Sequence, residues 1–193
     1  ESALMFFSIG AIYYYLLWIG DDSLRCFLLA TLFTTLAILT KLPASFIGIP
    51  MIYLSIKRYG IKVFQEIKLY IFPVVTLCIP FLYFYWLGTI AEQKFVSGIG
   101  SSMILTGFTN SIFKTEIIKY LWEQFATKVF TVPGIILFLA GVMIPKTKDE
   151  NFYYAWLVAC ILHVIFIDAV IHLDYYLMFI TPVISVFMGY TAA

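Results

Sequence analysis

The sequence predicts an all-α protein: a polytopic bundle of about seven transmembrane helices with one extracytoplasmic loop and one interfacial helix. Hydrophobic residues make up 63% of the chain and charged residues 12%, and the mean hydropathy is +0.98. A soluble chain of this length needs more polar surface to cover its core, whereas lipid can face the excess apolar side chains. Apolar runs also recur along the whole chain with short polar segments between them, which indicates one transmembrane domain over residues 1–193.

The helices follow from run length, because a span needs roughly 20 apolar residues, or somewhat fewer where flanking groups reach the interface. The second and third runs are short, and only Lys41, Leu42 and Pro43 separate them. We expect a tight helical hairpin there, with Pro43 in the first turn of the returning helix. The predicted spans are residues 2–20, 24–40, 42–56, 69–88, 128–145, 153–170 and 174–193.

The segment 89–127 is too polar to cross a membrane. Residues 97–111 are rich in Gly, Ser and Thr and predict a mobile loop, while residues 114–128 carry apolar side chains at helical spacing, such as Ile117, Leu121 and Phe125. This second part is predicted to lie along the membrane surface, either as a structural shelf or as a lid over a lipid substrate.

Basic residues set the predicted orientation, because Lys and Arg collect in short cytoplasmic loops. The connection at residues 57–68 holds four basic residues and one acid, Glu66, and is predicted to be cytoplasmic. Glu1, Lys41, residues 89–127 and a polar group near residue 170 then fall on the opposite, extracytoplasmic side of the plasma membrane. The four basic residues are Lys57, Arg58, Lys62 and Lys68.

Lys41 is the first candidate site residue. It ends a long apolar run, and a cation at that depth can pair with a phosphate where a low dielectric strengthens the attraction. The plainer interpretation is that its side chain simply reaches toward water.

A second candidate group lies between the last two predicted spans. Asp168 and His172 are four residues apart and share a helical face, and Asp174 follows. The group supplies too few oxygen ligands to favour a divalent cation, so no metal or other cofactor is indicated. His172 is better interpreted as a hydrogen-bond donor to a phosphate or sugar, and Tyr175 and Tyr176 suit the membrane interface.

The chain resembles the polyprenyl-phosphate-sugar-dependent membrane glycosyltransferases, which include protein O-mannosyltransferases and lipid A aminoarabinose transferases and share the glycosyltransferase-C fold. The likeness rests on four stretches in the family's order: ESALMFF, LATLFTTLAILTKLPASFIGIP, FTVPGIILFLAGV and HLDYYLMFITPVISVFMGY. A Lys-x-Pro hairpin followed much later by His-x-x-Tyr-Tyr-Leu and Pro is the more specific part.

The resemblance implies an enzyme that transfers a sugar from a lipid-linked donor to a protein, lipid or glycan acceptor at an extracytoplasmic site. Lys41 and His172 would bind the donor phosphate. Glu1 matches an acidic position at the start of a span and is a possible catalytic base. The remaining cavity-lining residues would be Asp168, Asp174, Tyr175 and Tyr176.

One departure is important. The family's principal acidic residues lie in a first external loop upstream of the matched region, and this sequence does not contain that loop. We therefore expect a fragment of a longer protein, truncated at both ends, which would not turn over substrate by itself.

Two alternatives remain open. A transporter or flippase for a lipid-linked or amphipathic substrate would favour internal repeats and buried mid-span charges, and here only His163 points that way. A non-catalytic membrane subunit would give the external polar residues no common purpose. Acidic and basic residues nearly balance, so the charge indicates no nucleic-acid partner.

Overall fold

The structure, a computed structural model, describes residues 2–90, 119, 122–145, 147, 150–166 and 179–192. Its regular elements are all helices, with no strand in these ranges, which confirms the all-α prediction. The chain divides into two compact units, an N-terminal unit within residues 2–100 and a C-terminal unit within residues 101–193. That the two units form one transmembrane domain stays a prediction. The predicted mobile loop at residues 97–111 lies outside the described residues, so it also stays a prediction.

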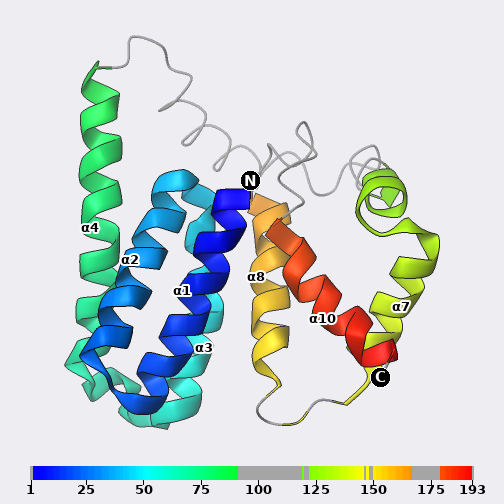
Figure 1. The fold of residues 1–193 in the computed structure, drawn as a ribbon, viewed down its shortest axis with the longest axis horizontal. Helices are drawn as coiled ribbons and strands as arrows, with labels where there is room; N and C mark the ends of the chain where they lie inside the picture. The colour runs from blue at the N-terminus through cyan, green and yellow to red at the C-terminus, as the bar shows by residue number, and fades with distance from the viewer. Residues whose placement is uncertain are drawn as a thin grey trace. The chain divides into compact units, whose positions relative to one another are not determined.

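Four α-helices and two 3-10 helices build the N-terminal unit (Figure 1). α1 packs against α2 and α3, and α2 packs against α4. The core contains an aromatic cluster in which the ring of Phe72 lies 4.9 Å from Tyr15 and 5.4 Å from Trp18, measured between centroids. In chain order the elements are α1 (Ser2–Asp21), α2 (Leu24–Thr40), η1 (Leu42–Ile47), α3 (Gly48–Tyr59), η2 (Gly60–Gln65) and α4 (Ile67–Ile90).

The predicted hairpin between the second and third runs is present and tighter than expected. Lys41 alone separates α2 from η1, with an extended backbone at φ −162° and ψ 121°. Its N–H donates to the carbonyl of Ala37 at 3.0 Å, and its own carbonyl accepts from the N–H of Ala44 at 2.9 Å. Pro43 lies in the first turn of the returning helix, as predicted, but that turn is 3-10 rather than α. Short 3-10 turns of this kind are common at helix N-termini.

The connection at residues 57–68 also differs from a simple loop. α3 continues to Tyr59, and η2 then fills most of the distance to α4. Gly60, at φ +55°, is the junction between them. This backbone conformation is one that glycine adopts without a steric penalty, which lets the chain turn sharply there.

The C-terminal unit contains three described α-helices and one π-helical turn. Residues 122–124 are helical and lead into the π-helix η3 (Phe125–Val129), so the described part of the predicted surface helix is helical. α7 (Thr131–Met143) and α10 (Thr181–Ala192) pack closely, and α8 (Phe152–Phe166) contacts α10. Thr191 Oγ1 donates to the carbonyl of Leu137 at 2.7 Å across the α7–α10 contact.

In the part of the chain that the structure describes, two helices are long and apolar enough to cross a membrane, α1 and α4, with mean hydropathies of 1.6 and 1.9. Much of the surface of α4 is exposed and apolar, and its buried residues Phe72, Thr76 and Pro80 recur every fourth position on one face. The helices α2, α7 and α8 are also apolar but shorter. Length and composition therefore support membrane association, while the count of seven spans stays a prediction.

Candidate functional site

Of the site residues predicted from the sequence, Lys41 is the one that lies within the described residues. Its side chain is partly exposed at the corner between α2 and η1. The other predicted residues lie outside the described ranges, so their meeting with Lys41 stays a prediction. They are Glu1, Asp168, His172, Asp174, Tyr175 and Tyr176.

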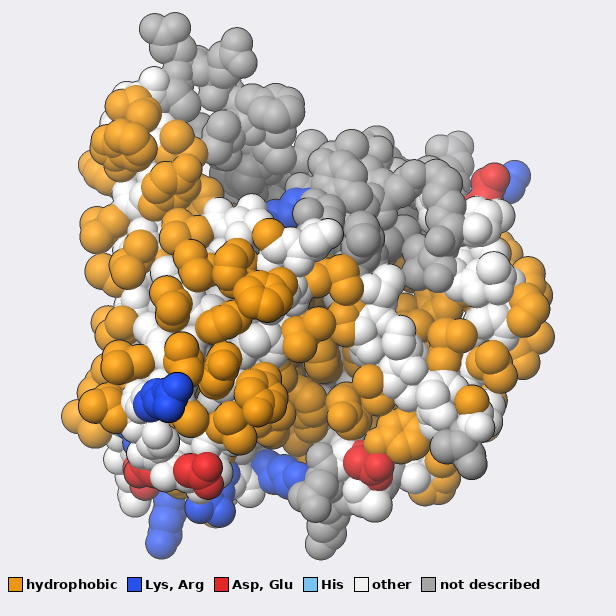
Figure 2. Space-filling view, in the orientation of Figure 1, with side chains coloured by type: hydrophobic (Ala, Val, Ile, Leu, Met, Phe, Trp, Pro, Cys, Tyr) orange, Lys and Arg blue, Asp and Glu red, His pale blue; other side chains and the backbone are white. Residues whose placement is uncertain are grey.

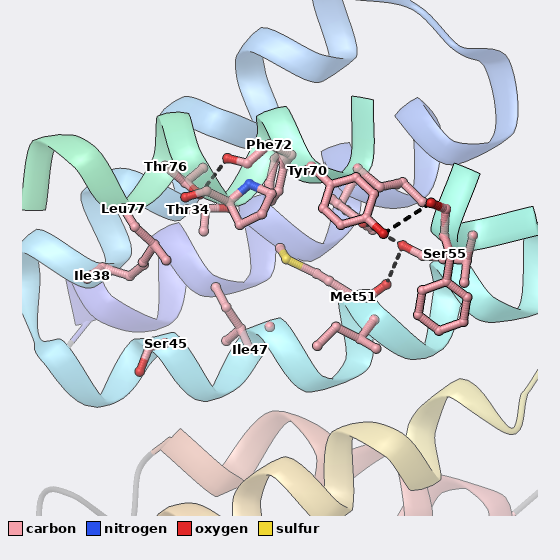
Figure 3. A pocket seen from close by; sticks show the side chains of 17 residues that line it. Thr34, Ile38, Ser45, Ile47, Met51, Ser55, Tyr70, Phe72, Thr76 and Leu77 are labelled. Carbon is pink, nitrogen blue, oxygen red and sulfur yellow. Dashed lines mark hydrogen bonds between the residues drawn. The ribbon is translucent and has the colours of Figure 1, made fainter. Parts of the chain in front are cut away.

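A groove of about 360 Å³ lies between α3 and α4 in the N-terminal unit (Figure 3). Side chains from α1 and α2 contribute to its lining as well. In Figure 3, Ile47 and Met51 point from the η1–α3 segment toward Phe72 and Thr76 of α4. The groove reaches Ile38 and Ser45, which are three and four residues from Lys41 along the chain. Lys41 is therefore close in sequence to one end of this groove.

The buried hydroxyl groups that line the groove are satisfied by the protein itself. Tyr15 donates its hydroxyl hydrogen to Ser55 Oγ at 2.7 Å, because Ser55 donates its own to the carbonyl of Met51 at 3.0 Å. Thr34 Oγ1 donates to the carbonyl of Ala30, and Thr76 Oγ1 to that of Phe72, both at 2.7 Å. With these hydroxyls engaged, the lining suits a hydrocarbon chain better than a polar ligand.

A proline in α4 explains one contact beside the groove. Pro80 has no N–H, so it cannot supply the usual helical hydrogen bond to the carbonyl of Thr76, four residues earlier. Thr35 on α2 donates its hydroxyl hydrogen to that carbonyl at 3.3 Å. Neighbouring helices commonly satisfy backbone groups that proline frees in apolar helices. This bond joins α2 to α4 on the wall opposite α3.

The groove was not predicted from the sequence, which we interpreted mainly through its charges. The available signal was weak: hydroxyl residues at positions 34 and 35 inside one apolar run, and prolines at positions 73 and 80 inside another. Such residues are uncommon inside apolar helices without a reason, but only packing shows that they meet.

The C-terminal unit has a second cavity of about 420 Å³, lined wholly by apolar residues of α7, α8, α10 and positions 122–130. Cys160 of α8 lines it, and so do Trp122 and Phe125 from the segment before α7. His163 is buried in α8, with its ring 4.9 Å from that of Phe179 between centroids. Among the described residues, no charged side chain lines this cavity.

Comparison with known proteins gives no assignment: no family model, no curated protein and no solved structure matches this chain.

Proposed function

We propose that this chain is part of a membrane glycosyltransferase that moves a sugar from a polyprenyl-phosphate donor to an acceptor on the extracytoplasmic side. The observation that supports the proposal is the position of Lys41 in sequence beside one end of an apolar groove. A cation next to a hydrocarbon-compatible groove suits a ligand with an anionic head and a long apolar tail.

The two parts of the donor would use different physical interactions. The phosphate would pair with Lys41, where the apolar surroundings make the attraction stronger than in water. The first isoprene units would lie in the groove, whose volume falls in the range of roughly 300–1,000 Å³ that is usual for small-molecule sites. Because the buried groove hydroxyls already have protein acceptors, an apolar tail leaves none of them newly unsatisfied.

The proposed reaction is a displacement at the anomeric carbon of the sugar. The acceptor oxygen forms the new bond while the bond from that carbon to the phosphate oxygen breaks, and a carboxylate takes the acceptor's proton. Lys41 would stabilise the charge on the departing lipid phosphate. By resemblance, His172 would share this role, Asp168, Asp174, Tyr175 and Tyr176 would line the cavity, and the carboxylate would be Glu1 or an acid upstream of it.

The first test is to identify the lipid that the protein retains. The protein is purified from its native membrane as wild type, Lys41→Ala and Lys41→Arg, and the bound lipids are identified by mass spectrometry. We expect a polyprenyl phosphate or its sugar adduct in the wild type, its loss in Lys41→Ala and partial recovery in Lys41→Arg. Lys119→Ala removes an exposed cation in the other unit and is the matched control.

A second variant tests the groove rather than the charge. Gly48 lines the groove, has an ordinary helical backbone, and has open space around the position of a Cβ. Gly48→Phe should therefore fill the groove without backbone strain and displace the lipid tail. Gly88→Phe places the same ring in open space on α4, away from the groove lining, and should leave lipid retention unchanged.

The outcomes distinguish the proposal from its alternatives. Ordinary phospholipid in every variant would contradict the role of Lys41 and favour a transporter or a non-catalytic subunit. The flippase would be favoured by a different result. In that case the protein binds a polyprenyl lipid and moves it across the bilayer, but no sugar is transferred from the lipid to an acceptor.

A further inference from the structure

The helix η2 presents a row of strongly exposed apolar side chains at the end of the N-terminal unit. A 3-10 helix has three residues per turn, so side chains three positions apart lie above one another. Ile61 and Phe64 form such a row and are 91% and 77% exposed, and Ile67 at the start of α4 is 74% exposed. Aligned apolar side chains with this exposure are unusual on a surface that faces only water.

Basic residues lie close to this row in the sequence. Lys62 lies in the neighbouring row of η2, and Lys57 and Arg58 lie in the last turn of α3; all three are exposed. In the space-filling view, Lys and Arg side chains gather toward the end of the N-terminal unit where α1 ends and α4 begins (Figure 2). The surface therefore combines apolar groups with positive charge, the pattern that binds at an anionic membrane interface.

Basic residues outnumber acidic residues by five to three in residues 20–25 and 57–68. Asp22 is engaged by Lys68 at 2.6 Å, and that ammonium also lies 5.4 Å from the ring centroid of Tyr59. Arg58 is oriented by a 3.4 Å hydrogen bond from Nη2 to the carbonyl of Gly20. In residues 20–25 and 57–68, Asp21 and Glu66 are the other acids, beside Arg25, Arg58 and Lys62.

We propose that η2 and its basic neighbours form a docking surface for anionic phospholipids. Ile61, Phe64 and Ile67 would enter the boundary between headgroups and acyl chains. Lys57, Arg58 and Lys62 would contact lipid phosphates at the headgroup level. The proposal depends on membrane association but not on glycosyl transfer, so loss of the role of Lys41 would leave it standing.

The test is lipid competition on the whole protein in mixed micelles of phosphatidylglycerol and phosphatidylcholine, with bound lipids counted by native mass spectrometry. The wild type should prefer phosphatidylglycerol, and added salt should reduce the preference because exposed charges are screened. The variant Lys57→Gln/Arg58→Gln/Lys62→Gln should lose most of it, since each cation near an anionic surface contributes a factor of about five. Lys119→Gln should retain the preference.

A second variant separates the apolar contribution from the charge. Ile61→Ser/Ile67→Ser should lower the number of both bound lipids while keeping their ratio, and the exposure of both side chains means that the fold should survive. Thermal unfolding checks this for each variant. An unchanged phosphatidylglycerol preference in the triple glutamine variant would overturn the proposal. So would a serine variant that unfolds more easily without losing lipid, because η2 would then be covered by protein.

Discussion

The hydroxyl of Thr35 on α2 donates to the backbone carbonyl of Thr76 on α4 at 3.3 Å, and Pro80 is the reason that this carbonyl lacks its usual helical donor. The contact lies among apolar helices, where an unsatisfied carbonyl is costly. It therefore supports both the α2–α4 packing and one wall of the groove.

The Thr35–Thr76 contact predicts a specific coupling. Thr35→Val should lower the free energy of unfolding by about 0.6 kcal/mol, the average for hydrogen bonds between membrane helices, and by no more than about 1.7 kcal/mol. Pro80→Ala restores an N–H that can reach the Thr76 carbonyl, so Thr35→Val should cost clearly less in that background. Denaturant titration in bicelles measures the double-mutant cycle.

Thr31→Val is the matched control for that cycle. Thr31 is on the same helix, and its hydroxyl is buried without a hydrogen-bond partner among the described residues. Its replacement should be neutral or stabilising. Equal losses for Thr31→Val and Thr35→Val, or an additive cycle with Pro80→Ala, would refute the assigned contact.

Gly141 predicts a packing defect in the C-terminal unit. A Cβ at this position would lie 1.8 Å from the carbonyl oxygen of Phe187 on α10. Gly141→Ala should therefore push α7 and α10 apart and cost about 1–3 kcal/mol or more, as overpacking does elsewhere. Gly189→Ala is the control, because open space surrounds its Cβ position and alanine favours a helix. The midpoint temperature of thermal unfolding should fall for Gly141→Ala and not for Gly189→Ala.

The Tyr15–Ser55 pair predicts unequal single-mutant costs. Tyr15→Phe leaves Ser55 with its acceptor at Met51, so the loss should be about 1 kcal/mol. Ser55→Ala instead leaves the buried Tyr15 hydroxyl without this acceptor and should cost about 1–3 kcal/mol. The double variant should cost less than the sum of the two, as determined from unfolding free energies. Additive costs would show that the two hydroxyls do not interact.

We expect the backbone conformation at Asp22 to affect stability more than the ion pair of this residue does. The pair with Lys68 joins side chains that are 28% (Lys68) and 62% (Asp22) exposed, so Asp22→Asn should cost no more than about 1 kcal/mol, and less at high salt. Asp22 also has φ 53°, which asparagine tolerates and alanine does not. Asp22→Ala should cost about 1–2 kcal/mol more than Asp22→Asn. Equal unfolding free energies for the two variants would contradict this strain.

The positions of the described helices were largely predictable because charged or polar residues interrupt the apolar runs. α2 matches its predicted range of 24–40, and α4 exceeds its prediction by two residues at each end. The 3-10 character of η1 and η2 was not predictable, since periodicity over six residues does not separate 3-10 from α geometry. The π-turn at η3 likewise depends on local packing rather than on composition.

The candidate site was predictable only in part. Lys41 was identified because a lone cation after a long apolar run is conspicuous. The groove arises where residues of six elements, from α1 to α4, come together, and no pattern along the chain encodes that volume. The bond from Thr35 to Thr76 spans 41 residues and likewise required the fold.

In the predicted topology, where the returning segment of the hairpin crosses the membrane, the 3-10 geometry of η1 also affects the bilayer thickness that this segment can match. A 3-10 helix rises about 2.0 Å per residue against 1.5 Å for an α-helix, so the six residues of η1 extend this segment by about 3 Å. The apolar part of this segment, residues 42–56, then reaches about 26 Å, against about 30 Å for the hydrocarbon of a typical bilayer. The short apolar segment thus gains length without added residues. This extra length reduces its hydrophobic mismatch beside the longer helices α1 and α4.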